Sequence, residues 1–345
     1  MTSIYYVGLD VHKKSISYCA KTEDGRIVQE GEVAATRAAL SAWAEHLPGP
    51  WIGALEATLF TGWIYDHLQP YAQQLKVAHP VLLKAIAASK KKNDRVDARK
   101  ISDLVRVDLL PECYLAPRPL RELRRVLRYR NLVVRQAVRM KNKIAGLLLE
   151  TGTPHHKEKL HGRRYFQELL GSLEGVPDSV VELLRLTRCS WEAFHRMEQK
   201  LIAGLCQDPE LTERVARLRT IPGVGQITAL TWALEVGEPQ RFATVGQAVS
   251  YCELCSAQRE SGGHSQRGPL SKQRNKHLQS ILIEAAKLAP RWSPSLAELY
   301  ARELQRGNRN RATLAVARKR VAYLLAVDRS GKAFESRAPA ERAAA

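Results

Sequence analysis

The sequence lacks a run of eighteen apolar residues, and its N-terminus lacks the layout of a secretory signal peptide. Its six cysteines are scattered, and Cys252-x-x-Cys255 has neither a second Cys pair nor a His pair nearby. These absences argue against a membrane protein, a disulfide scaffold and a structural zinc site. We expect a soluble cytoplasmic protein with reduced thiols, in which Cys252 and Cys255 pack against neighbouring helices.

Acidic residues become scarce after the first quarter of the chain. Residues 1–88 hold seven Lys/Arg and eight Asp/Glu, which gives them a net charge of −1. Because the whole chain has a formal charge of +19, residues 89–345 carry +20. Residues 118–143 hold ten Lys/Arg and one acid. A solvated basic surface is the alternative, but such a segment repels itself unless a polyanion neutralises it. We therefore expect it to bind nucleic acid.

The first 88 residues alternate between strand and helix patterns. Hydrophobic β-formers indicate strands at 4–11, 15–21, 26–34, 51–56 and 75–79, with helices at 37–46, 60–72 and 81–88. Three antiparallel strands followed by alternating helices and strands are typical of an α/β RNase H-like, or RuvC-like, fold.

Four carboxylates stand at informative places in this pattern. Asp10 and Glu56 each end an apolar strand, and Asp94 and Asp97 stand three apart in a predicted helix, which places them on one face. A buried strand seldom tolerates an acid unless a cation pairs with it. Oxygen ligands of this kind suit Mg²⁺, and two shared ions form a common machinery for cutting phosphodiesters.

Two short segments carry phosphate-binding signals. Lys90, Lys91 and Lys92 directly precede Asp94, where a solvated loop is the alternative. Gly223 and Gly225, in Pro222-Gly223-Val224-Gly225, open a predicted helix and resemble the hairpin of helix-hairpin-helix DNA-binding modules, with a plain interhelical turn as the alternative.

The middle of the chain reads as two long helices, about 119–150 and 178–217, joined by a polar tip at 151–176. They predict an antiparallel coiled-coil arm that serves dimerisation or nucleic-acid clamping. The basic residues at helical spacing along the first helix are Arg121, Arg125, Arg128, Arg135 and Arg139.

Residues 259–276 contain a serine next to two glycines, Ser261-Gly262-Gly263. A flexible loop would let the hydroxyl approach phosphorus while nearby cations stabilise the developing charge. From spacing alone an ordinary Ser-Gly loop is as good a reading, and Ser265 and Ser271 are rival nucleophiles. The surrounding cations are Arg259, Arg267, Lys272 and Arg274. The tail from about Asp328 has a composition typical of frayed ends.

Taken together these pieces resemble the DEDD transposases of the insertion-sequence one-ten family, described as bridge-RNA-guided recombinases. The matching segments, in chain order, are Gly8-Leu9-Asp10-Val11-His12-Lys13, Leu55-Glu56-Ala57-Thr58, Asn93-Asp94-Arg95-x-Asp97-Ala98, Ile221-Pro222-Gly223-Val224-Gly225, and Ser261-Gly262-Gly263 followed by Arg267-Gly268 and Leu270-Ser271-Lys272. Asn93 stands where relatives usually have Thr, and Tyr251-Cys252-Glu253-Leu254-Cys255 replaces a run of smaller residues.

The resemblance implies a RuvC-like domain (1–112) whose acids map to Asp10, Glu56, Asp94 and Asp97, a basic helical arm (113–217), a mostly α-helical transposase domain (218–327) and a flexible tail (328–345). It implies that Ser261 attacks DNA and forms a phosphoserine, with two Mg²⁺ ions, or Mn²⁺ in their place, held by the acids. It also implies donor and target DNA, a structured guide RNA, and a homodimer or tetramer whose active sites combine two protomers, at the nucleoid of a prokaryote.

Two other functions fit parts of the sequence. A junction-resolving endonuclease would use the same acids to activate water and would need neither serine nor RNA. An architectural nucleic-acid-binding protein would account for the charge but would leave the four acids unexplained.

Overall fold

The computed structural model describes residues 3–86, 93–270 and 275–335, and the chain divides into two compact units, residues 1–118 and 119–345. Each unit is described by itself below. Among the described residues no helix is long and apolar enough to cross a membrane.

The first unit is built on a mixed five-stranded sheet with strand order β3-β2-β1-β4-β5. Strands β1, β2 and β3 form an antiparallel meander, and β4 and β5 run parallel to β1. The strands are β1 (Tyr5–Val11), β2 (Ser15–Lys21), β3 (Ile27–Ala34), β4 (Trp51–Glu56) and β5 (Gln74–Ala78). The expected strands are confirmed to within one residue at each end, because their apolar alternation is strong.

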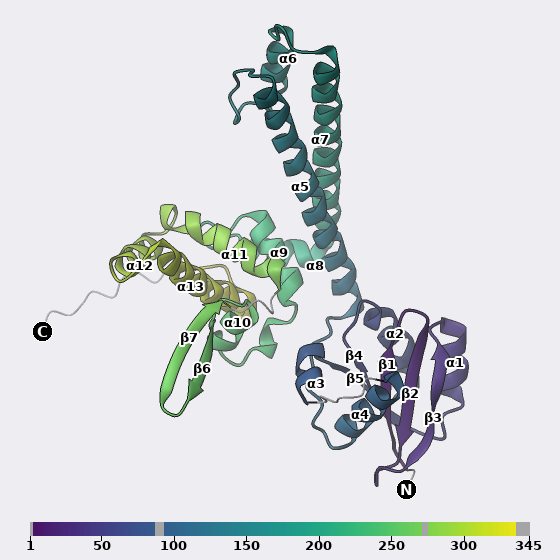
Figure 1. The fold of residues 1–345 in the computed structure, drawn as a ribbon. Coiled ribbons are helices and arrows are strands. Elements are labelled where there is room, and N and C mark those ends of the chain that lie inside the picture. The colour runs from purple at the N-terminus through teal and green to yellow at the C-terminus, as the bar shows by residue number, and fades with distance from the viewer. Residues whose placement is uncertain (1–2, 87–92, 271–274, 336–345) are drawn as a thin grey trace, which may run out of the picture. The chain divides into compact units, whose positions relative to one another are not determined.

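Helices cover both faces of this sheet. On one face, Leu40 and Trp43 of α1 (Arg37–Glu45) and Ile64 of α2 (Thr61–Leu68) pack on alternate residues of β1. On the other face lie α3 (Pro80–Ile86) and α4 (Asp94–Arg106), which bury Leu83 and Ile101. The unit is therefore a three-layer α/β domain (Figure 1).

Helix α4 lies directly on β1 at Gly8. A Cβ atom at Gly8 would stand 2.1 Å from the carbonyl oxygen of Ala98 and 2.4 Å from the amide nitrogen of Ser102. The Ser102 hydroxyl donates to the carbonyl of Tyr6 at 2.9 Å. Arg99 of α4 also donates two hydrogen bonds of 2.7 Å to Glu30 of β3. The contacts of α4 with β1, at Gly8 and Tyr6, and with β3, at Glu30, therefore fix where the helix lies on the sheet.

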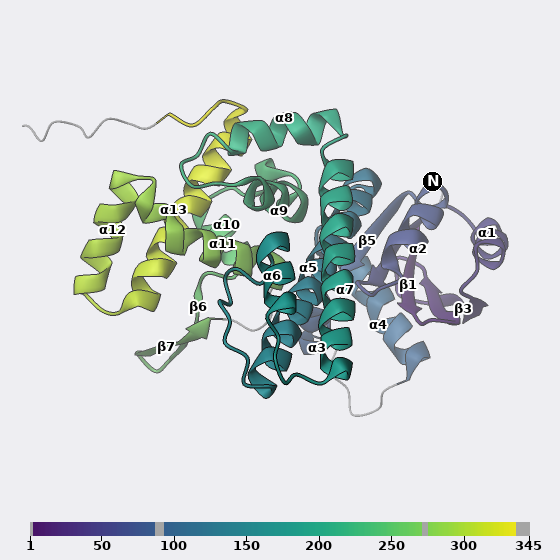
Figure 2. The same ribbon diagram turned by 90° about the horizontal axis from the view of Figure 1, so that it is seen from above.

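The second unit begins with an arm in which α5 (Arg118–Glu150) and α7 (Asp178–Leu205) lie side by side, with α6 (Arg163–Gly171) at their far end (Figures 1 and 2). The arm has a small core of its own, in which Leu148, Phe166 and Leu184 come from the three helices. The sequence had indicated only a polar tip at 151–176, so α6 is an addition. Its apolar residues are few and adjoin many polar ones.

The predicted helix at 178–217 is wrong as a single element. It consists of α7 and a separate α8 (Pro209–Leu218), because Asp208 and Pro209 start a new helix. The Asp208 side chain caps α8 by accepting from Leu211 N at 2.8 Å, and Pro209 takes the first helical position, where no amide hydrogen is needed.

The rest of the second unit is a helical body around a large apolar core. Its central element is α9 (Gln226–Val236), in which every residue from Thr228 to Val236 is buried. Helices α8 and α11 (Lys276–Leu288) pack directly on it, and α13 (Arg309–Ser330) contacts α8, α10 (Val245–Tyr251), α11 and α12 (Pro294–Gln305). The expectation of a mostly helical second half is confirmed.

A β-hairpin extends from this body in place of the expected flexible loop around Ser261 (Figure 1). It comprises β6 (Ser256–Ser261) and β7 (His264–Leu270), joined by Gly262 and Gly263. Both glycines have positive φ, +57° and +80°, which is typical of a two-residue hairpin turn. Glycine suits both turn positions because residues with a side chain rarely adopt positive φ.

The tail also departs from expectation. Helix α13 continues to Ser330, and buried Asp328 accepts two hydrogen bonds of 2.7 Å from Arg214 and one of 2.9 Å from Trp232. The Phe334 ring packs against the Tyr323 ring at a centroid distance of 5.0 Å, tilted by 56°. The frayed tail therefore does not start at Asp328, and residues 336–345 lie outside the described part of the chain. Cys252 is buried as expected, whereas Cys255 is exposed and does not pack.

Candidate active site and nucleic-acid interface

Asp10 lies on the face of the sheet that α4 covers. Val7, Leu9 and Val11 of β1 belong to the core under α1 and α2, so the alternate residues Gly8 and Asp10 face the other way. Asp10 is only 8% exposed, which is unusual for an acid.

A compact group of possible metal ligands forms around Asp10. The His12 Nε2 atom lies 3.3 Å from Asp10 Oδ2 and 3.3 Å from Asp94 Oδ2. One ligand atom from each of the three residues falls within 4.8 Å of the others. Asp94 arrives there because Asn93 caps α4, accepting from Arg95 N at 3.0 Å, so that the helix begins beside the end of β1.

The electrostatics of this group favour a cation. Burial raises the pKa of Asp10, His12 opposes the increase, and the charges of Asp94 and Asp97 raise the pKa further. A carboxylate that is both desolvated and surrounded by other acids is stabilised by a bound positive charge. Two carboxylates and an imidazole are suitable ligands for a divalent metal ion.

Glu56 and Asp97 stand outside this compact group but close to it in the fold. Leu9 of β1 pairs in parallel register with Leu55 of β4, so Asp10 and Glu56 each follow one residue later at the carboxyl ends of adjacent strands. Asp97 is one turn after Asp94 on α4 and lies 3.3 Å from Lys100. The Thr61 hydroxyl holds the chain after β4 by donating to the Glu56 carbonyl at 2.8 Å.

Ser261 is the last residue of β6 and is exposed. Its register partner is His264, directly across the Gly262-Gly263 turn. A Cβ atom at either glycine would meet nothing within 4 Å, so the turn beside the hydroxyl is open. A large substrate can therefore approach Ser261 without displacing neighbouring chain.

The predicted basic stripe on α5 is exposed in part. Arg125, Arg135 and Arg139 are exposed, and Arg121 is half-buried. Arg128 donates two hydrogen bonds to a buried carboxylate, Glu235, at 2.8 and 2.7 Å, so its charge is already paired within the protein. Lys90, Lys91, Lys92, Lys272 and Arg274, together with the side chains of Arg259 and Arg267, lie outside the described residues.

The turn at Pro222–Gly225 is built around a buried arginine. Gly223 has φ +73°, and Gly225 precedes α9. Arg320 of α13, with no exposed surface, donates to the carbonyls of Pro222 at 3.4 Å and Gly223 at 3.0 Å. Burial lowers the pKa of Arg320 to about 10, so it remains a cation at neutral pH.

Sequence reasoning missed His12, Arg320 and Glu235. His12 could have been found from its position two residues after Asp10, which places both on one side of an extended chain. Arg320 and Glu235 are buried charges whose side chains have hydrogen-bond partners between 40 and 107 residues away, so no local pattern identifies them.

Two family models match the chain. One, described as "Transposase" and built on DEDD transposases of the IS110 type, covers residues 7–153, and the other, described as "Transposase IS116/IS110/IS902 family", covers residues 215–301. The first spans the acids and the arm helix α5, and the second spans the Pro222–Gly225 turn and the Ser261 hairpin.

Individual proteins are similar over nearly the full length. The transposase for insertion sequence element IS1328 of Yersinia enterocolitica is 25% identical over 97% of this chain and 99% of its own length. The transposase for insertion sequence element IS1111A of Coxiella burnetii is 24% identical over 95% of this chain and 90% of its own. An insertion element IS110 protein of 43.6 kDa from Streptomyces coelicolor is 32% identical over 48% of this chain and 40% of its own. The chain belongs to the IS110 family of transposases, enzymes that act on DNA.

Proposed function

We propose that this transposase cuts and rejoins donor and target DNA through a covalent bond to Ser261, with a divalent metal ion at the acids and a structured RNA as guide. The observation that carries the proposal is the meeting of Asp10, His12 and Asp94 at the end of β1, in a family of DEDD transposases. A mixed sheet of order β3-β2-β1-β4-β5 with α4 on one face supports an RNase H-like assignment.

Asp10 and Asp94 would hold the metal ion, with His12 as a third ligand or as a residue that orients the two carboxylates. Glu56, at the end of the strand beside β1, and Asp97, one turn after Asp94, would complete the site for a second ion. When bound, Mg²⁺, or Mn²⁺ in its place, would neutralise the charge on the phosphate and lower the pKa of an attacking hydroxyl. The protein residues hold the carboxylates at a fixed spacing through the contact of α4 with Gly8.

The proposed step at Ser261 is a phosphoryl transfer. The Ser261 oxygen attacks phosphorus, its proton leaves, a serine–phosphate ester forms, and the bond from phosphorus to one sugar oxygen breaks with protonation of that oxygen. Attack of another strand's sugar hydroxyl on the ester then releases Ser261 and restores a phosphodiester. The number of phosphodiester bonds is conserved, so strand exchange needs no external energy source.

The basic second unit suits nucleic-acid binding. Arg125, Arg135 and Arg139 are exposed along α5, and the Pro222–Gly225 turn precedes α9 as in a helix-hairpin-helix module. We propose that α5 and α7 form a coiled-coil arm within residues 113–217, that residues 218–327 carry the serine chemistry, and that two protomers combine to form each active site.

One experiment tests the chemistry. Wild type, Ser261→Ala and Asp10→Asn, each carrying the RNA that co-purifies with the protein from the native host, are incubated with Mg²⁺, donor DNA and target DNA, and the products are resolved under denaturing conditions with and without protease. We expect a protein–DNA adduct with wild type only. Free 5′-phosphate ends without an adduct, made equally by Ser261→Ala, would contradict the serine assignment and favour the junction-resolving endonuclease.

The guide RNA is tested separately by purification from the native host, sequencing of bound RNA and a salt titration. One abundant RNA encoded beside the gene and retained at moderate salt supports the guided recombinase. Heterogeneous RNA that is lost steeply with salt indicates non-specific phosphate binding.

A further inference from the structure

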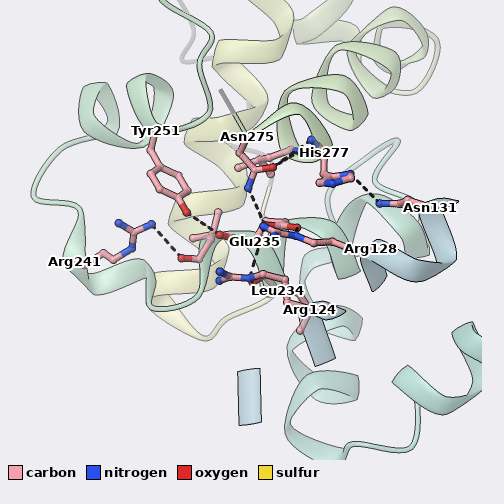
Figure 3. Close-up of polar contacts among 11 residues, drawn as sticks. Arg124, Arg128, Asn131, Leu234, Glu235, Arg241, Tyr251, Asn275 and His277 are labelled. Carbon is pink, nitrogen blue, oxygen red and sulfur yellow. Dashed lines mark hydrogen bonds and ion pairs between the residues drawn. The ribbon is translucent and has the colours of Figure 1, made fainter. Parts of the chain in front are cut away.

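The second unit contains a buried polar group, centred on Glu235, at the point where the arm meets the helical body (Figure 3). Glu235, near the end of α9, has no exposed surface. Its two carboxylate oxygens accept from Nε and Nη2 of Arg128 on α5, at 2.8 and 2.7 Å. The Asn275 side-chain nitrogen donates to the same carboxylate at 2.7 Å.

This group is charged. Burial alone would raise the pKa of Glu235, but the hydrogen bonds from Arg128 and Asn275 outweigh it, and the pKa lies below its ordinary value. Arg124 adds a second cation 3.7 Å away and donates to the carbonyl of Leu234 at 2.8 Å. The Arg128 side chain is 47% exposed and Glu235 is fully buried, so only the carboxylate depends on this pairing for its charge. Removing the partners of a buried carboxylate is costly, which favours the arrangement that keeps Glu235 paired.

Asn275 connects this ion pair to the start of α11. While its side-chain nitrogen donates to Glu235, its side-chain oxygen accepts from the amides of His277 at 3.2 Å and Leu278 at 3.3 Å, which caps the helix. His277 Nδ1 accepts from Asn131 of α5 at 3.4 Å (Figure 3). Burial lowers the pKa of His277, which favours the neutral ring that can accept.

The first turn of α11 also holds the Ser261 hairpin. Gln279, one turn after Asn275, donates to the carbonyl of Glu253 at 2.6 Å, three residues before β6 begins. Asn275 itself is the fifth residue after the end of β7. The chain before β6 is therefore joined to the start of α11 by this hydrogen bond, and the start of α11 is joined to α5 through Glu235.

We propose that Arg128, Glu235 and Asn275 form a positioning relay that fixes the hairpin of Ser261 relative to the arm. Arg128 is then a structural residue of this relay, and because its side chain is 47% exposed, its predicted contact with phosphate stays a prediction beside that role. The inference rests on the proposed function in one respect only, that Ser261 is the nucleophile which the relay positions.

Three variants separate the relay from folding. In Asn275→Ser the hydroxyl can still cap α11, but the donor to Glu235 is lost. In Asn275→Asp the cap is kept and two carboxylates face each other. In Glu235→Gln the ion pair is lost, because a neutral amide with one acceptor oxygen cannot accept from Arg128 Nε, Arg128 Nη2 and Asn275 as the carboxylate does. The matched control is Asn308→Ser, the same change at the cap of α13, where Asn308 accepts from Arg311.

The direct measurement is the distance between spin labels on the arm and on the hairpin. Cys189 of α7 is exposed and can be labelled, Gln266 of β7 is exposed and can be changed to Cys, and Cys113, Cys206 and Cys255 are changed to Ser. We expect a narrow distribution for the parent and Asn308→Ser, and a broader one for Asn275→Ser, Asn275→Asp and Glu235→Gln. Equal widths for all would overturn the proposal.

The functional measurement is the single-turnover rate of DNA cleavage at saturating DNA. Because a small misplacement of a reacting group is costly, we expect Asn275→Ser to lower the rate at least about tenfold with unchanged DNA affinity, and Asn308→Ser to leave the rate unchanged. A broadened distance with an unchanged rate would also overturn the relay's role. The distance result does not depend on serine chemistry, so activity of Ser261→Ala would contradict the proposed function alone.

Discussion

At the scale of single residues, the candidate metal site depends on how His12 is used. Its Nε2 atom lies at the same distance, 3.3 Å, from a carboxylate oxygen of Asp10 and of Asp94. The ring joins a strand residue to a helix residue, so it can serve as a ligand or as the group that keeps the two carboxylates together. In both cases its loss should weaken metal binding without removing the acids.

We therefore expect His12→Gln to lower the affinity for Mn²⁺ by about 10–100-fold, the range seen when residues that orient metal ligands are replaced. The affinity is read from the Mn²⁺ concentration at which thermal stabilisation is half complete. His46→Gln is the control, because that exposed histidine ends α1 and bonds to the carbonyl of Ala42. An unchanged midpoint for His12→Gln would show that the ring takes no part.

A second prediction at this scale concerns Glu30, whose carboxylate links β3 to α4. The hydrogen bond from Arg99 holds the pKa of Glu30 below its ordinary value of 4.5, and Arg95 adds to this. A lowered folded-state pKa contributes stability above the unfolded value, and this contribution is lost as the pH falls through the folded pKa. Glu30→Gln should therefore melt lower than wild type at pH 7, and the two melting temperatures should converge below about pH 4. A constant difference across this range would contradict the linkage.

At the scale of elements, the approach of α4 to β1 determines whether the acids meet. Gly8 allows it, since any side chain there would overlap helix backbone rather than a movable side-chain end. A methyl group at Gly8 has to push the helix outward, and Asp94 and Asp97 move with it. The geometry of the site is thus set by a residue that has no functional group.

Gly8→Ala should destabilise the protein by about 1–3 kcal/mol, as overpacking does, and should also abolish Mn²⁺ binding. Gly146→Ala, in a helix with nothing within 4 Å of the added methyl, is the matched control. It should be neutral or more stable by up to about 1 kcal/mol, since alanine is the better helix former. Chemical denaturation measures the first effect, and metal-dependent melting measures the second. Normal Mn²⁺ binding by Gly8→Ala would show that α4 need not lie this close.

The elements also show what sequence reasoning can reach. Strands β1, β4 and β5 were predictable as short, mostly apolar runs bounded by clear turns, and the polar β3 was predictable because Asp24-Gly25 marks a hairpin after β2. Asp208-Pro209, a capping residue followed by a proline suited to the first helical turn, indicates a helix start at α8. The apolar helical pattern continues on both sides of this pair, which favoured the prediction of one long helix. The Ser261 hairpin was harder, because β6 and β7 are polar and exposed and have no buried face to give alternation. The Glu235 relay needs long-range contacts that no local pattern contains.

At the scale of the whole molecule, charge and chemistry are divided between the two units. The acids belong to residues 1–118, whose first 88 carry a net −1, and Ser261 belongs to residues 119–345, which hold the basic arm. Each unit holds half of the proposed chemistry. An active site that requires both can be assembled within one chain or between two chains, and these arrangements differ in a way that mixing experiments detect.

We expect assembly between two protomers, and the test is complementation of two inactive variants. In a mixed dimer, the Asp10→Asn chain keeps Ser261 and the Ser261→Ala chain keeps all four acids. If each site takes its acids from one chain and its serine from the other, these intact groups meet in one site. One site in that dimer is complete and the other lacks both groups. Equal mixing with random exchange makes half of the dimers mixed, and each has one working site of two, so about a quarter of wild-type activity should return.

The subunits are exchanged before DNA is added, and the adduct is measured on the Asp10→Asn chain, distinguished by an added tag. If each site formed within one chain, every site in the mixture would lack one group and no adduct would appear on either chain.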